Sequence, residues 1–259
     1  MMLFYGWTDL LLLNMAHTKL SFHENEQTDL YVLMLPRVSE QLVSLIEDSG
    51  IFNNVYKVHG KFAPLTKYDV LFTGAFWADS LVIFKYMPGA TINIVEEGTS
   101  HYNKKGRIYW YSIGWKRHYH RLKFFNIIRK AKKAINKVYV YEPRLCNYKN
   151  TVQLPKLDIR IINILKSIDV NLDDYKADVW DLTNMHPTTQ PKRPMLEAVI
   201  AQLDKEQIEA KTIVSPNSSV LINVGNMFGY KPKLVFTKKD YLTKKIVGAL
   251  PNATFRKDK

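Results

Sequence analysis

Three short polar motifs in the sequence have residue types suited to acid–base chemistry on an anionic substrate. The first is Glu96-Glu97-Gly98, which follows the apolar run from Thr91 to Val95. Ninety residues after Glu96 comes His186-Pro187, and thirty-two residues after His186 comes Ser218-Ser219. Carboxylates, an imidazole and a pair of hydroxyls together suggest a base, an acid and an anion-binding site.

The two glutamates are the first candidates for chemistry. In an open α/β sheet the carboxyl ends of the strands line the ligand crevice, so an acidic pair at that place points at a substrate. Burial and the like charge of Glu97 are expected to raise the pKa of Glu96, which suits a general base near neutral pH. Gly98 permits a tight turn and the close approach of a ligand. The alternative is that both glutamates solvate a loop or cap the next segment.

The second and third motifs are suited to binding a phosphate. Pro187 fixes the backbone directly after His186, so the imidazole can donate a hydrogen bond to a phosphate and protonate it as it leaves. Ser218 and Ser219 follow an expected strand and open an expected helix, where backbone N–H groups and hydroxyls bind anions. The alternatives are a structural or surface histidine and ordinary helix N-caps.

Hydrophobic runs and breaker residues alternate in a way that predicts strands and helices along the whole chain. Strands are expected at 2–5, 29–35, 55–58, 70–73, 92–95, 137–141, 179–183, 211–214 and 233–236. Helices are expected at 8–19, 38–48, 76–86, 156–167, 193–207 and 240–250, and from Ser218 onward. Short strands separated by helices imply parallel pairing. The prediction is an α/β fold with two Rossmann-like domains, 1–142 and 143–259, a linker near 143–155 and a cleft between the domains.

The charge of the chain points to anionic partners. The formal net charge is +13, and the stretch from Lys104 to Lys137 contains twelve Lys or Arg residues and no acid. Aromatic residues are interleaved there, so a peripheral contact with an anionic membrane surface competes with a solvated helical face. Nucleic acid is not expected, because no module signature for it is present.

The remaining composition limits the class of protein. The single cysteine, Cys146, excludes an intramolecular disulfide and a cysteine-based zinc site, and it fits a reducing compartment. Residues 1–13 lack a basic start and carry Asp9, so they are expected to form a strand and a helix rather than a signal peptide. No uncharged apolar run is long enough to span a bilayer.

The order of the three motifs resembles that of the bacterial sialyltransferases of the two-domain GT-B type. The sequence from Glu96 to Tyr102, the basic aromatic segment after it and Tyr141-Glu142-Pro143 look most like the lipooligosaccharide and capsule sialyltransferase family, glycosyltransferase family fifty-two. The resemblance covers most of the chain in layout, but only the three motifs are specific. The sequence departs from the pattern after His186-Pro187, where Pro191 and Pro194 follow instead of an early charged residue.

The resemblance implies a metal-independent, inverting transfer of sialic acid from CMP-sialic acid to a hydroxyl of a surface glycan, with no cofactor. It implies that 1–142 is the acceptor-side domain and 143–259 the nucleotide-sugar-binding domain. Glu96 would be the base and His186 the group that assists departure of the phosphate. Glu97, Gly98, Pro187, Ser218 and Ser219 would bind substrate.

Two other hypotheses for the function stay open. The first is a glycosyltransferase of the same fold with another nucleotide sugar, and the second is a non-catalytic membrane-binding or polyanion-binding protein. The second half is compact for this fold, so two explanations stay open for it: the loss of peripheral strands, or completion of the site by a homodimer. The expected location is the cytoplasm, peripheral to the inner face of the plasma membrane.

Overall fold

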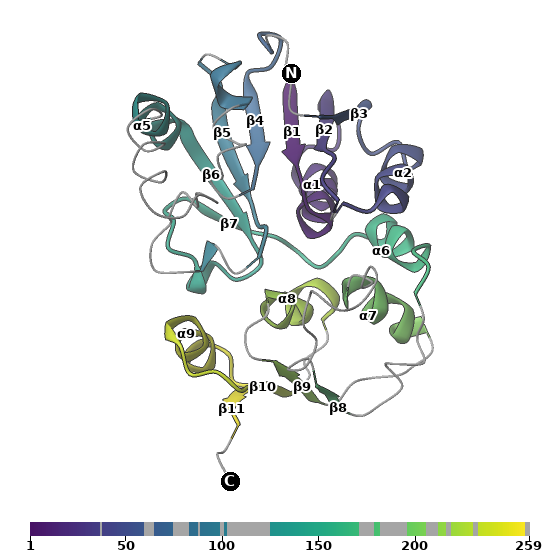
Figure 1. Ribbon diagram of the computed structural model, residues 1–259, viewed down its shortest axis with the longest axis vertical. Helices are drawn as coiled ribbons and strands as arrows, with labels where there is room; N and C mark the ends of the chain where they lie inside the picture. The colour runs from purple at the N-terminus through teal and green to yellow at the C-terminus, as the bar shows by residue number, and fades with distance from the viewer. Residues whose placement is uncertain are drawn as a thin grey trace.

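The computed structural model consists of strands that alternate with helices along the chain (Figure 1). It describes residues 1–36, 38–59, 65–74, 83–87, 89–98, 101–102, 125–170, 179–181, 196–205, 212–215, 219–229 and 233–256.

The first half of the chain forms a seven-stranded parallel sheet with the strand order β3-β2-β1-β4-β5-β6-β7. The strands are β1 (Met2–Gly6), β2 (Thr28–Leu33), β3 (Asn54–Val58), β4 (Val70–Thr73), β5 (Thr91–Val95), β6 (Ile135–Val140) and β7 (Thr151–Gln153). The elements between them include the helices α1 (Asp9–Phe22), α2 (Glu40–Asp48) and α5 (Phe125–Ala134) and the 3-10 helix η2 (Pro143–Leu145). The α/β class is therefore confirmed, and the sheet is compatible with a Rossmann-like fold.

The second half of the chain forms a smaller parallel sheet of four strands, in the order β11-β10-β9-β8. Its elements are α6 (Ile159–Lys166), β8 (Val179–Asp181), α7 (Leu196–Lys205), β9 (Thr212–Ser215), α8 (Ser219–Phe228), β10 (Lys233–Phe236), α9 (Tyr241–Ala249) and β11 (Ala253–Phe255). Helix α9 begins with a capping box, in which the Asp240 side chain accepts from the Thr243 N–H and Thr243 Oγ1 accepts from the Asp240 N–H.

The apolar strand runs of the sequence form the core because the central strands are covered on both faces. Leu3 and Phe4 of β1 are fully buried, and the Phe4 ring stacks on Phe72 of β4 with centroids 4.2 Å apart. Helix α1 begins where Thr8 accepts a hydrogen bond from the Leu11 N–H, as an N-cap does. Its long run of buried residues shows that this helix lies in the interior rather than on the surface.

Two parts of the chain differ from the expected pattern or lie outside the description. The segment 143–155, expected as a linker, contains β7, and Val138 to Val140 of β6 pair with it. The chain thus leaves the first sheet after Gln153. This strand was not expected, because three residues among turn formers have too little periodicity to be recognised in the sequence. Most of the expected helix 76–86 and of the basic stretch before Phe125 lie outside the described residues.

The strand order of the first sheet reverses between β1 and β4, which are neighbours and pair in parallel. From β1 the following strands, β2 and β3, extend the sheet on one side, and from β4 the strands β5, β6 and β7 extend it on the other. In parallel α/β sheets ligands bind outside the carboxyl ends of the strands at such a switch point. Figure 1 shows the carboxyl ends of β1 and β4 pointing toward the half of the molecule that carries α7 and α8. The residues that follow β1 and β4 therefore lie on the side of the sheet that faces the second half of the chain.

Candidate functional site

Glu96 directly follows β5 at this sheet edge and is completely buried. Its Oε2 accepts hydrogen bonds from the Tyr102 hydroxyl and, at 2.9 Å, from the Tyr141 N–H. Its Oε1 has no hydrogen-bond partner among the described residues. One carboxylate oxygen is thus held in place while the other remains available to a further donor.

Burial raises the pKa of Glu96 to about 7, and this is the largest influence on the group. The hydrogen bonds from Tyr102 and from the Tyr141 N–H act in the opposite direction, and the nearby charge of Glu142 raises the pKa further. Burial at the strand end therefore acts as expected, but the like charge comes from Glu142 rather than from Glu97. A carboxyl group that titrates near neutral pH has the proton affinity that a general base requires.

A buried amide on α1 fixes the backbone at Glu96. The Asn14 Nδ2 donates to the Glu96 carbonyl oxygen at 2.9 Å, and the Tyr141 hydroxyl donates to Asn14 Oδ1 at 3.1 Å. Both Asn14 and Tyr141 are fully buried. Asn14 and Tyr141 therefore position the candidate base. Neither role could be predicted, because an asparagine inside an apolar helix gives no sign of its tertiary partner.

Glu97 lies next to the ends of the two strands that flank the switch point. Its Oε1 accepts a hydrogen bond of 2.8 Å from Trp7 Nε1, and Trp7 follows β1 directly. Gly74, which follows β4, leaves the necessary room, since a Cβ there would come within 2.7 Å of Glu97 Oε2. The substrate-binding role expected for Glu97 remains a prediction.

The loop after β5 needs a glycine and encloses a neutral histidine. Gly98 has a φ of 126°, which residues with a Cβ rarely adopt. The Gly98 carbonyl oxygen accepts from the His101 N–H at 3.3 Å, and the Glu97 N–H donates to His101 Nδ1 at 3.3 Å. Burial lowers the pKa of His101 to about 4, so this ring is uncharged at neutral pH.

Helix α8 of the second half faces the buried carboxyl. Asn223 is fully buried and lies close enough to Glu96 to lower its pKa, although the two groups do not form a hydrogen bond of standard geometry. Neither polar atom of the Asn223 amide has a hydrogen-bond partner in the described part of the chain. An unpartnered amide and an unpartnered carboxylate oxygen thus meet between the halves, where a bound hydroxyl would satisfy both.

The second-half motifs lie mostly outside the description. His186, Pro187 and Ser218 are not among the described residues, and Ser219 is the first residue of α8. The structure therefore brings Glu96, Glu97 and Gly98 together at one sheet edge and places the start of α8 in the facing half. The roles expected for the histidine and the two serines remain predictions.

No protein-family model matches this sequence, and no curated protein is significantly similar to it.

Two further findings concern metal binding and membrane spanning by the described residues. No cluster of three or more His, Cys, Asp or Glu side chains in these ranges is arranged to hold a metal ion. None of the helices within them combines the length and apolar character needed to cross a bilayer.

Proposed function

We propose that this protein is an inverting glycosyltransferase that moves sialic acid from CMP-sialic acid to a hydroxyl of a surface glycan. The observation that carries the proposal is the Glu96 carboxyl. It is buried at the carboxyl end of β5, has a pKa of about 7, and keeps one oxygen without a partner opposite α8. The sialic acid donor itself rests on the resemblance of the three motifs.

In the proposed reaction Glu96 takes the proton of the acceptor hydroxyl through Oε1, the oxygen that no described residue engages. The acceptor oxygen forms a bond to the anomeric carbon of sialic acid. The bond from that carbon to the phosphate oxygen of CMP breaks, and its electron pair leaves with the phosphate. His186 gives a proton to the departing phosphate, so the base ends protonated and the acid deprotonated.

The start of α8 is the proposed place of the phosphate. Ser219 is the first residue of α8, whose sequence to Phe228 contains no acidic residue. Exposed N–H groups at a helix N-terminus and the dipole of the helix favour an anion there. Asn223 lies one turn further along the same helix and next to Glu96, so base and phosphate would be separated by about one helical turn, ~6 Å.

The proposed arrangement is that of a GT-B enzyme, with the acceptor on the seven-stranded half and the donor on the four-stranded half. Glu96 is completely buried, so an acceptor hydroxyl reaches Oε1 only when α8 separates from the edge of β5. Opening and closing of the two halves is therefore part of the proposal, and closure would exclude water from the reacting groups.

Helix α5 supports a peripheral location at an anionic membrane, which we include in the proposal. Its exposed residues include Arg129, Lys130, Lys132 and Lys133, and Phe125 at its start is 59% exposed. Basic side chains beside an exposed aromatic ring bind the headgroup region of anionic lipids. A lipid-linked glycan acceptor would be found at that surface.

The test combines a nucleotide panel with two substitutions. Of CMP, UDP and GDP, CMP should give the largest rise in the thermal unfolding midpoint, and transfer from CMP-sialic acid should disappear in Glu96→Gln and in His186→Ala. Glu96→Gln should retain CMP binding better than His186→Ala. A preference for UDP would replace the donor with another nucleotide sugar, and full turnover by both variants would refute the mechanism.

A further inference from the structure

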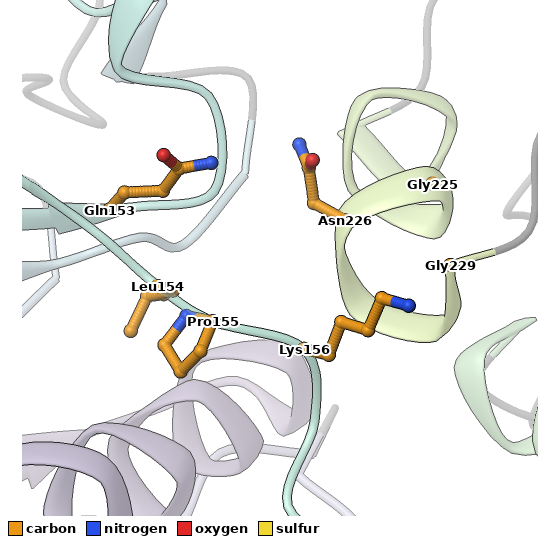
Figure 2. Close-up of a pocket in the computed structure, with 7 residues that line it drawn as sticks. All are labelled: Gln153, Leu154, Pro155, Lys156, Gly225, Asn226 and Gly229. Carbon is orange, nitrogen blue, oxygen red and sulfur yellow. The ribbon is translucent and has the colours of Figure 1, made fainter.

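A cavity of about 550 Å³ lies between the end of β7 and helix α8 (Figure 2). Its volume falls inside the range of roughly 300 to 1,000 Å³ that is usual for small-molecule sites. The lining residues come from the segment after β7 and from the C-terminal half of α8: Gln153, Leu154, Pro155, Lys156, Gly225, Asn226 and Gly229.

The wall of this cavity carries two primary amides. Figure 2 shows the side chains of Gln153 and Asn226 extending toward each other across the space. Among the described residues, Gln153 Nε2 donates one long hydrogen bond of 3.5 Å, to the Tyr141 carbonyl, and the Asn226 side chain forms no hydrogen bond. Each amide offers donors and an acceptor, which is the combination that a sugar ring with several hydroxyls requires.

One exposed residue that lines the cavity, Lys156, carries a positive charge. Lys156 forms no ion pair with a carboxylate of the described residues. Its Nζ lies against Gly229, where a Cβ would come within 2.8 Å of it, and Gly229 has a φ of +73°. A side chain at position 229 would displace the flexible end of Lys156, so glycine leaves room for the ammonium here, from which it can pair with an anionic group on a ligand.

The main chain of Tyr141 forms hydrogen bonds both to a residue that lines the cavity and to Glu96. The Tyr141 carbonyl accepts from Gln153, and the Tyr141 N–H donates to Glu96 Oε2. Helix α8 also runs from Glu96 to the cavity: Asn223 lies next to Glu96, and Asn226 lines the cavity one turn further on. The cavity is thus on the side of Glu96 that faces away from the start of α8, where the leaving phosphate is proposed to bind.

We propose that this cavity binds the terminal sugar of the acceptor glycan, and that this sugar carries a carboxylate or a phosphate. The assignment rests on the proposed function and deepens it. In an in-line transfer the acceptor enters opposite the leaving group. Once α8 has separated from the end of β5, a sugar whose hydroxyl reaches Glu96 would therefore extend toward Gln153 and Asn226. Gln153 and Asn226 bind its hydroxyls, and Lys156 pairs with its anionic group.

The experiment measures the affinity of galactose, galacturonic acid and galactose 6-phosphate for the full chain by ligand-observed NMR titration. The proteins are the wild type, Lys156→Gln, Lys156→Arg and the control Lys57→Gln. Lys57 is exposed on β3, at the opposite edge of the sheet from β7, so the control removes the same charge far from the cavity. The two acids distinguish a carboxylate from a phosphate as the preferred group.

At least one of the two acids should bind the wild type about tenfold more tightly than galactose does, as one charge-assisted pair allows. Lys156→Gln should lose this preference and leave galactose binding unchanged, whereas Lys156→Arg and Lys57→Gln should keep it. Equal binding of all three sugars to the wild type, or a preference that survives Lys156→Gln, overturns the assignment.

A further arm separates this inference from the proposed function. A non-transferable analogue of CMP-sialic acid should bind together with galacturonic acid; displacement of the acid would show that it occupies the place of the donor sugar and would overturn the acceptor assignment. Transfer to neutral glycans alone would leave the proposed function intact and refute the acidic acceptor. Lys156-dependent binding of acids without consumption of CMP-sialic acid would refute the transfer and keep an acidic-sugar site.

Discussion

Neutralising Glu96 should stabilise the protein at alkaline pH while it abolishes the proposed activity. In Glu96→Gln the amide oxygen can accept the same hydrogen bonds from the Tyr102 hydroxyl and the Tyr141 N–H that the carboxylate accepts. The shape of the group is almost unchanged, so the main difference is the loss of a charge that is completely buried.

The size of the effect follows from the pKa of Glu96, which burial raises from 4.5 to about 7. At about 1.4 kcal/mol per pH unit, this difference corresponds to about 3 kcal/mol. The folded state binds the proton more tightly than the unfolded state, so the free energy of unfolding falls as the pH rises from 4.5 to about 7 and is constant above that. The glutamine variant does not undergo this fall.

The assay is urea unfolding of the wild type and Glu96→Gln at pH 5 and pH 8. The stability advantage of the variant should be larger at pH 8 than at pH 5 by about 2 to 3 kcal/mol. Glu142→Gln is a control that should lower the free energy of unfolding rather than raise it. The hydrogen bonds from Arg144 lower the pKa of Glu142, so the charge of this carboxylate stabilises the folded state. An advantage of Glu96→Gln that is the same at both pH values would refute the reasoning.

Three further substitutions test other parts of the site. Burial lowers the pKa of His101 to about 4, so stability should fall as the pH drops from 6.5 toward 4, and His101→Gln should flatten this acid limb in urea unfolding; an unchanged limb would contradict it. Burial raises the pKa of Glu197 on α7 to about 7, so Glu197→Gln should raise the thermal midpoint at pH 8 and not at pH 4.5; a lower midpoint at pH 8 would argue against this. Gly74→Ala places a Cβ within 2.7 Å of Glu97 Oε2 and should cost about 1 to 3 kcal/mol in urea unfolding, with a change in the fluorescence of Trp7; wild-type stability would disagree with the packing described.

The parallel sheet and the place of the acidic motif could be predicted because both depend on local pattern. The run from Thr91 to Val95 is apolar and β-rich, and it forms β5 with Glu96 at its carboxyl end. Thr8 and Asp240 cap their helices, as residues of their type do at helix starts. These features involve neighbours within a few residues, which a single sequence contains.

The partners of the acidic motif could not be predicted, because they come from distant parts of the chain. Asn14 lies 82 residues from Glu96 and Tyr141 lies 45 residues from it, and each has a polar group at Glu96 only after the strands have taken the order seen in the sheet. The position of the buried Asn223 amide beside Glu96 could not be predicted for the same reason. A polar residue in an apolar helix is recognisable, but the group that it faces depends on the tertiary fold.

The central claim is that the Glu96 carboxyl takes the proton of the acceptor. The pH dependence of sialic acid transfer tests this claim most directly. The rate of CMP release from CMP-sialic acid in the presence of an acceptor should rise with pH along an acidic limb with a midpoint near 7, in line with the raised pKa of Glu96. It should fall again at higher pH, where His186 no longer carries the proton that it gives to the phosphate. Glu96→Gln should abolish the pH-dependent rate at every pH. A rate that is independent of pH between 5.5 and 8.5, or a midpoint that remains near 7 in Glu96→Gln, would contradict the account.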